Sequence, residues 1–126
     1  MTKVIIREDY GNSPKNVFVQ ELTIAFAKGD TKFIQSNVTD DVRWVIVGDS
    51  LVEGKGKIVE MLKQLKNDKV VELTIQHIAT HGKAGAVDGR LKFKNGKKVA
   101  YCNVYEFSNS KGTSVKEINS YEIELK

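Results

Sequence analysis

The stretch AGAVDGRLKFKNGKKVAYCNVYEF, residues 84–107, decides the fold. At its centre, Asn95 and Gly96 separate two segments in which apolar and polar residues alternate. An Asn-Gly pair is typical of a type I′ turn, because both central residues of that turn need a positive φ. The stretch therefore predicts a β-hairpin with strands over residues 84–93 and 99–107.

One further strand is predicted on each side of this hairpin. Residues 70–80 and 114–125 carry β-branched residues, and Ser108–Gly112 supplies the turn before the last of them. The second half of the chain is therefore predicted to form a four-stranded antiparallel meander.

The first half of the chain carries helix signals. Ser13 can cap a helix whose first turn holds Pro14, a position that needs no backbone donor. Gly29 is typical of a helix C-terminus, and Asp30 can cap a second, shorter helix that ends near Asn37. Two consecutive helices are therefore predicted in this part of the chain.

A strand and a third helix follow. Residues 42–47 are β-branched and aromatic, and Gly48–Ser50 supplies turn residues, so a strand pairing is expected there. Residues 57–65 restore a helical spacing of apolar residues, with Asn67–Asp68 as the exit. Helices first and strands later predict a segregated α+β domain rather than alternating β-α-β units.

Composition limits the classes of protein to consider. A length of 126 residues with 40% hydrophobic residues fits one globular domain. Cys102 is the only cysteine, so no internal disulfide can form, and no Cys or His cluster has metal-ligand spacing. We therefore expect no metal and no organic cofactor.

Charge and hydropathy argue against two kinds of partner. The net charge is +4, but the lysines are scattered among acids, which is typical of a solvated surface and not of a nucleic-acid site. The N-terminal apolar run is only Val4–Ile6, and no run approaches the roughly 18 apolar residues of a membrane span. We expect a soluble cytoplasmic protein that binds neither nucleic acid nor membrane.

The order of these elements resembles a known family. Two helices, the strand at Asp40–Trp44, the helix that begins in Gly54–Ile58 and four long strands are similar to the SnoaL-like branch of the nuclear-transport-factor-2-like superfamily. The resemblance covers residues 13–125 and implies a cone-shaped barrel, in which three helices pack on a strongly curved, mostly antiparallel sheet around an apolar pocket. Residues 1–12 would then be an N-terminal extension and residues 13–126 the domain.

Members of this family do different things with the pocket. They include polyketide cyclases, ketosteroid isomerases, limonene epoxide hydrolases and non-enzymatic binding modules, so the fold alone settles no function. Asp88 falls where the epoxide hydrolases are expected to carry a proton-donating aspartate, but Ser120 replaces their water-activating aspartate. Asn103 falls at the oxyanion-donating acid of the isomerases, whose general base falls on Ile46. The resemblance therefore implies Asp88 and Asn103 as catalytic candidates, without a general base.

Strand alternation indicates the other side chains of the pocket wall, because successive residues of a strand face opposite sides. The predicted ligand-binding residues are Trp44, Ile46, His77, Arg90, Tyr101, Tyr105 and Ser120. Some have a second explanation. Asp88 can instead pair with Arg90 or a lysine, or lie near a bulge at Gly89. His77 can be a satisfied core or rim histidine, and the tyrosines can face a dimer partner.

These observations favour a domain that binds a small apolar organic molecule, either flat or terpenoid-, polyketide- or steroid-like. Any catalysis would be acid–base assistance from Asp88 and Asn103, of the isomerase, cyclase or hydrolase type. The alternative is a non-catalytic dimerisation or accessory module with a vestigial pocket. The resemblance and the long exposed sheet also predict a homodimer.

Overall fold

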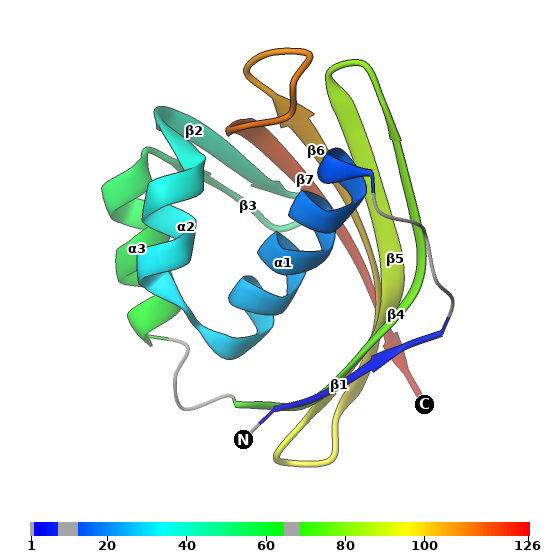
Figure 1. The fold of residues 1–126 in the computed structure, drawn as a ribbon. Coiled ribbons are helices and arrows are strands. Elements are labelled where there is room, and N and C mark those ends of the chain that lie inside the picture. Colours follow the sequence, from blue (N-terminus) through cyan, green and yellow to red (C-terminus); the bar gives the residue numbers. More distant parts are fainter. Residues whose placement is uncertain (1, 8–12, 65–68) are drawn as a thin grey trace.

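Three helices cover the concave side of one curved sheet (Figure 1). The computed structural model describes residues 2–7, 13–64 and 69–126. Within these residues the elements are, in chain order, β1 (Lys3–Ile6), α1 (Pro14–Lys28), α2 (Thr31–Asn37), β2 (Val38–Ile46), β3 (Ser50–Glu53), α3 (Lys55–Gln64), β4 (Val70–His81), β5 (Ala84–Phe93), β6 (Lys98–Phe107) and β7 (Val115–Leu125). The predicted α+β architecture, with helices on a strongly curved and mostly antiparallel sheet, is confirmed.

The first two helices begin and end where the sequence predicts. Ser13 is the N-cap of α1, although its side chain makes no capping hydrogen bond. Gly29 follows α1 in the left-handed conformation, with a φ of 70°, which suits a residue without a Cβ. Asp30 caps α2, because its carboxylate accepts a hydrogen bond from the Phe33 amide at 3.2 Å.

The third helix, α3, packs against strands β2 and β3. It begins at Lys55 rather than at the predicted Lys57. Its predicted end at Leu65 and the exit at Asn67–Asp68 lie outside the described residues.

The sheet joins early and late parts of the chain, in the order β1-β4-β5-β6-β7-β2-β3. Strands β4 to β7 form the predicted antiparallel meander, with the Asn95–Gly96 turn between β5 and β6. Strand β2 pairs in parallel with β7 and antiparallel with β3. The sheet is therefore mixed, and it curves around the helices without closing.

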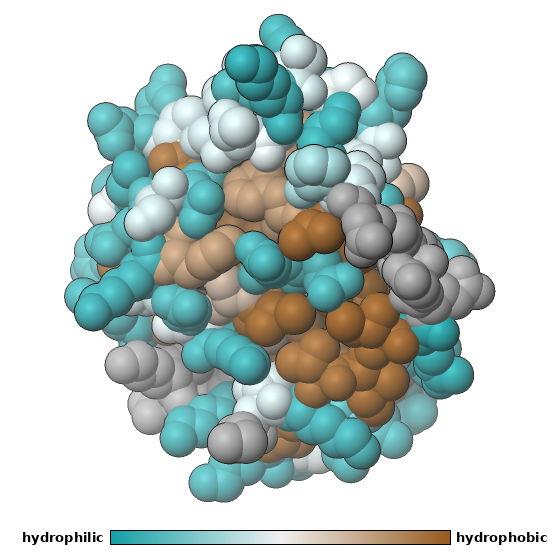
Figure 2. Space-filling model, in the orientation of Figure 1, coloured by the Kyte–Doolittle hydropathy of each residue, from teal (hydrophilic) through white to brown (hydrophobic). Residues whose placement is uncertain are grey.

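The segment predicted as an N-terminal extension contributes a strand that the sequence did not indicate. Strand β1 pairs in parallel with β4, with Lys3 opposite Glu72 and Ile6 opposite Ile75. It covers the edge of β4, which would otherwise present a row of unpaired backbone groups. Figure 2 shows hydrophobic surface over this part of the molecule, where Ile6 is 41% exposed.

Part of the space between helices and sheet is filled by a tight contact of α1 with β5 and β6. Tyr105 and Phe107 are fully buried in one cluster with Val19 of α1. Gly85 permits the contact, since a Cβ there would lie 2.9 Å from Val19 Cγ2 and 3.0 Å from the Phe107 ring. The N-terminal half of α1 is therefore in direct contact with the sheet.

Candidate functional site

A cavity of about 1060 Å³ lies between the helices and the concave face of the sheet. Thr23, Leu62, Tyr105 and Ile118 of its wall are buried, whereas the lysines that line it are exposed. The buried residues therefore mark its closed end and the exposed ones its mouth. The volume slightly exceeds the usual range for small-molecule sites, about 300–1,000 Å³.

Trp44 forms an apolar part of the wall. Its ring meets that of Phe26 edge-on, with the centroids 5.2 Å apart and the planes at 61°. Its indole N–H donates a hydrogen bond to Ser120 Oγ at 2.8 Å, across the parallel pairing of β2 with β7. The indole is thus fixed with its polar atom satisfied, so it presents mainly apolar ring surface to the cavity.

A chain of hydrogen bonds crosses the closed end. Thr23 donates its hydroxyl proton to the Val19 carbonyl at 2.8 Å, and its oxygen lies 3.1 Å from the Tyr105 hydroxyl. A hydroxyl has one proton, so Tyr105 must donate to Thr23. The Asn103 side chain also acts on Tyr105, because it lowers the pKa of this phenol. Asn103 lines the cavity, and its amide can donate a hydrogen bond to an occupant or accept one from it.

The two buried tyrosines of β6 remain neutral phenols near neutral pH. Burial raises the pKa of Tyr105 to about 12. Burial, followed by the nearby Tyr105, raises the pKa of Tyr101 well above its ordinary value. Tyr101 donates its hydroxyl proton to the Thr74 carbonyl at 3.1 Å. Both phenols are therefore hydrogen-bonded parts of the wall and not acids.

Glu122 is a carboxyl group at the mouth that the sequence reasoning missed. It follows Ser120 on the same face of β7 and lies opposite Tyr101 of β6. The residue as a whole is exposed, but partial burial of its carboxyl raises its pKa, an effect that Lys97 opposes and Asp49 reinforces. Strand alternation could have found it, because residues two apart on a strand share a face.

Six of the predicted site residues line this cavity. They are Trp44, Ile46, Tyr101, Asn103, Tyr105 and Ser120. They come from β2, β6 and β7, which are neighbours in the sheet although β2 precedes β6 by more than fifty residues. The parallel pairing of β2 with β7 is what brings the tryptophan into this group.

Asp88 lies outside the cavity, so the prediction that it points inward is wrong. It lies opposite Cys102, whereas Gly89 lies opposite Tyr101 and Val87 opposite Asn103. Cross-strand partners share a face, so Val87 and Gly89 take the inner face and Asp88 the outer one. The alternation of residues along a strand predicts which side chains share a face, but it does not predict which face points into the cavity.

The predicted ligand-binding residues His77 and Arg90 also lie on the outer face. His77 Nδ1 contacts the Asp88 carboxylate at 2.8 Å, and their side chains are 70% and 42% exposed. Strands β4 and β5 change register between Ile75 and His77, and this bulge sets His77 opposite Asp88. Arg90 lines a separate hollow of about 380 Å³. Neither residue borders the large cavity, and the partner of Asp88 is a histidine, not Arg90 or a lysine.

The wall of the cavity offers few groups for chemistry. Asn103 can donate or accept a hydrogen bond, and Glu122 can exchange a proton. Within residues 2–7, 13–64 and 69–126, no three His, Cys, Asp or Glu side chains gather as a metal-binding group. None of the helices in the same residues is long and apolar enough to cross a membrane.

The family model for SnoaL-like domains matches residues 19–115 of the chain. The chain belongs to the SnoaL-like domain family. Comparison with curated protein sequences finds no match. The predicted resemblance is therefore confirmed at the level of the family. The family match does not assign catalytic or binding residues to this chain.

Solved structures share the fold of this SnoaL-like domain at low sequence identity. A nuclear-transport-factor-2-like protein of unknown function from Cytophaga hutchinsonii is 23% identical, with a TM-score of 0.68, over 86% of this chain and 99% of that one. An epoxide hydrolase from M. tuberculosis that resembles limonene epoxide hydrolases is 18% identical, with a TM-score of 0.73, over 86% and 82%. A protein from Kribbella flavida assigned as a ketosteroid isomerase is 12% identical, with a TM-score of 0.76, over 89% and 79%.

Proposed function

We propose that this SnoaL-like domain binds a small, largely apolar organic molecule in its cavity, either flat or terpenoid-, polyketide- or steroid-like. The observation that supports this proposal best is the cavity of about 1060 Å³. The hydroxyls of its tyrosines and the indole N–H of Trp44 are already hydrogen-bonded to other protein atoms. An occupant therefore meets mostly apolar and aromatic surface, with Asn103 and Glu122 as the orienting polar groups.

Catalysis, where it occurs, rests on the same two residues. Asn103 lines the cavity, and its amide N–H can polarise a carbonyl oxygen of the occupant. Glu122, one of two carboxyl groups in the described lining of the cavity, replaces Asp88 in this role. One of the similar structures is an epoxide hydrolase and another is assigned as a ketosteroid isomerase. Epoxides and ketosteroids are small organic molecules, which supports this class of ligand.

Titration with the neutral fluorescent probe N-phenylnaphthylamine tests the proposal. The wild type should bind about one probe per chain, with emission that saturates. The double variant Ala27→Phe/Ile46→Phe adds ring volume from two walls of the cavity and should weaken binding at least about tenfold. The matched variant Ile6→Phe/Val17→Phe, at two exposed positions outside the cavity lining, should bind as the wild type does. Equal binding by both variants would refute the cavity as the site.

The outer face of the sheet supports a second proposal, that the domain forms a homodimer. Val47, Leu51, Tyr121 and Ile123 are 45% to 69% exposed. Leu51 pairs with Val45 of β2, which in turn pairs with Asn119 of β7, two residues before Tyr121. Apolar patches of this kind mark interaction surfaces. A second copy is the partner predicted for the family.

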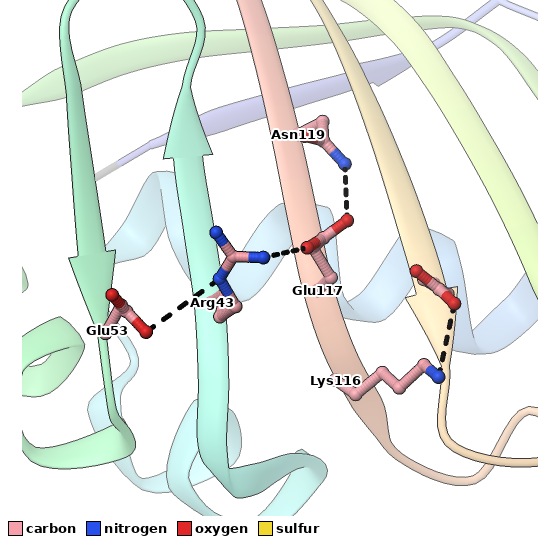
Figure 3. A network of polar contacts seen from close by, with 6 residues as sticks. Arg43, Glu53, Lys116, Glu117 and Asn119 are labelled. Carbon is pink, nitrogen blue, oxygen red and sulfur yellow. Dashed lines mark hydrogen bonds and ion pairs between the residues drawn. The ribbon is translucent and has the colours of Figure 1, made fainter.

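One end of this face is polar. Arg43 contacts Glu117 at 3.2 Å and Glu53 at 3.9 Å, and Lys116 contacts Glu106 at 3.2 Å (Figure 3). Such exposed ion pairs add little stability. They mark one border of the apolar area.

Light scattering of the full chain tests the dimer. The wild type should have twice the monomer mass at micromolar concentration, and Tyr121→Lys/Ile123→Lys should be monomeric. Val17→Lys, at an exposed apolar position on α1, should leave the mass unchanged. A monomeric wild type would overturn this proposal, whereas a dimer that binds no probe would favour an accessory module with a vestigial pocket.

A further inference from the structure

The charged residues that line the cavity are unevenly distributed around its mouth. Lys28, Lys69 and Lys94, here called the basic arc, come from the end of α1, the residue before β4 and the residue after β5. The acids of the lining, Asp49 and Glu122, come from the β2–β3 turn and from β7. Lys97 also lines the cavity, but it lies near Glu122 and contacts Glu124 at 3.9 Å. The mouth therefore has a basic side and a side on which the acids outnumber the lysine, here called the acidic side.

Two lysines of the basic arc face each other across a strand pair. Val70 pairs with Phe93, and the next residues outward are joined by a hydrogen bond from the Lys94 amide to the Lys69 carbonyl at 2.9 Å. Like charges directly opposite each other destabilise a sheet. Within the described residues, no carboxylate lies in ion-pair contact with Lys28, Lys69 or Lys94. Both lysines are exposed, so water screens much of this repulsion. Two positive charges nevertheless lie side by side, and both would attract an anion placed between them.

Other lysines near the sheet are accounted for without a ligand. Lys97 contacts Glu124 at 3.9 Å and is near Glu122, and Lys92 lies beside Glu72 in the strand pairing. Lys28 stands in the last turn of α1, where a cation is favoured by the helix dipole. The pair Lys69 and Lys94 is thus what requires a further explanation.

We propose that the ligand of this cavity carries a terminal carboxylate, held at the mouth by Lys69 and Lys94 while its apolar body lies against Trp44 and the closed end. This inference rests on the proposed function and names the class of ligand more closely, as an amphipathic organic anion. The apolar lining supplies affinity in proportion to the hydrocarbon it buries.

The acidic side of the mouth fixes the orientation of such a ligand. Glu122 and Asp49 would repel a carboxylate, and β7 is two strands away from β5, or about 10 Å at the usual strand spacing. The anionic end therefore lies at the basic arc. A group at the opposite edge of the ligand can still reach Glu122 and Asn103.

A matched pair of probes tests the inference. Anilinonaphthalene sulfonate and N-phenylnaphthylamine share the same aromatic body, but only the first is an anion. In Lys69→Glu/Lys94→Glu, the affinity for the sulfonate should fall about tenfold, because two attractions become two repulsions, while the affinity for the neutral probe should change less than about twofold. In the wild type, raising NaCl from about 0.05 to about 0.5 M should weaken the sulfonate alone.

The control variant Lys32→Glu/Lys111→Glu makes the same change in net charge at exposed positions outside the cavity lining and should leave both affinities within about twofold. Equal losses for the sulfonate in the two variants, or no loss in either, would overturn the inference while leaving the proposed function in place. Failure of the neutral probe to bind the wild type would instead overturn both. Circular dichroism spectra of all variants establish that each is folded before its affinity is compared.

Discussion

Gly89→Ala is the substitution to which the curved sheet should respond most strongly. A Cβ at this position would lie 1.8 Å from the Thr74 carbonyl oxygen and 2.8 Å from the Tyr101 hydroxyl. These two atoms are joined by the hydrogen bond that fixes Tyr101 in the cavity wall. Contacts below 3.0 Å are essentially never made by a real Cβ, so β4 and β5 must separate by more than an ångström.

The expected cost follows from these contacts. Forcing a methyl group into packed structure costs about 1–3 kcal/mol. Weakening the buried Tyr101–Thr74 hydrogen bond adds about 1–3 kcal/mol. We therefore expect Gly89→Ala to lower the free energy of unfolding by about 3–4 kcal/mol, which is a large part of the stability of a domain this size. Affinity for the neutral probe should fall as well, since Tyr101 borders the cavity.

Urea unfolding followed by circular dichroism measures the effect, with Gly56→Ala as the matched control. Gly56 lies in α3, and a Cβ there would meet nothing within 4 Å. Alanine should therefore stabilise this helix, by about 0.5–1 kcal/mol. A Gly89→Ala protein within about 0.5 kcal/mol of the wild type would refute the close approach of the two strands.

Three further predictions concern the cavity wall. Ser120→Ala removes the acceptor of the Trp44 indole N–H and should cost about 1 kcal/mol, with a shift in the fluorescence of this single tryptophan. Tyr105→Phe removes the hydroxyl between Thr23 and Asn103 and should cost about 1–2 kcal/mol in urea unfolding, more than Tyr121→Phe at an exposed position. Glu122 has a raised pKa, so its contribution to stability is present below its ordinary pKa of 4.5 and is lost as the pH rises through the raised value. Glu122→Gln should therefore match the wild-type melting temperature at about pH 4 and exceed it modestly at about pH 7, whereas a difference that grows toward acid would contradict the shift.

Local signals in the sequence were sufficient to predict most of the secondary structure. The Asn95–Gly96 turn, the Gly29 helix end and the Asp30 cap each act through the backbone of neighbouring residues, so they could be recognised without tertiary information. Strand β1 has no such signal, because its four residues are specified by a parallel pairing with the distant β4.

The candidate site was predictable only in part, for a related reason. Alternation placed Trp44 and Asn103 correctly on the cavity wall, but it assigned Asp88 to the wrong face. What decides the face of β5 is the inward position of Gly89 and the bulge that precedes His77, neither of which is visible in a single strand's pattern. Glu122 shares a face with Ser120, so alternation could have indicated its position, but the burial that raises its pKa comes from neighbouring elements and is not visible in the sequence.

Energy transfer from Trp44 to a bound probe tests most directly whether the cavity holds a small molecule. Trp44 is the only tryptophan of the chain, and it lies in the cavity wall. N-phenylnaphthylamine absorbs where tryptophan emits, so a probe in the cavity should quench Trp44 and show sensitised emission, both saturating at one probe per chain. Probe emission that rises without quenching of Trp44, or that never saturates, would contradict a binding site beside this residue.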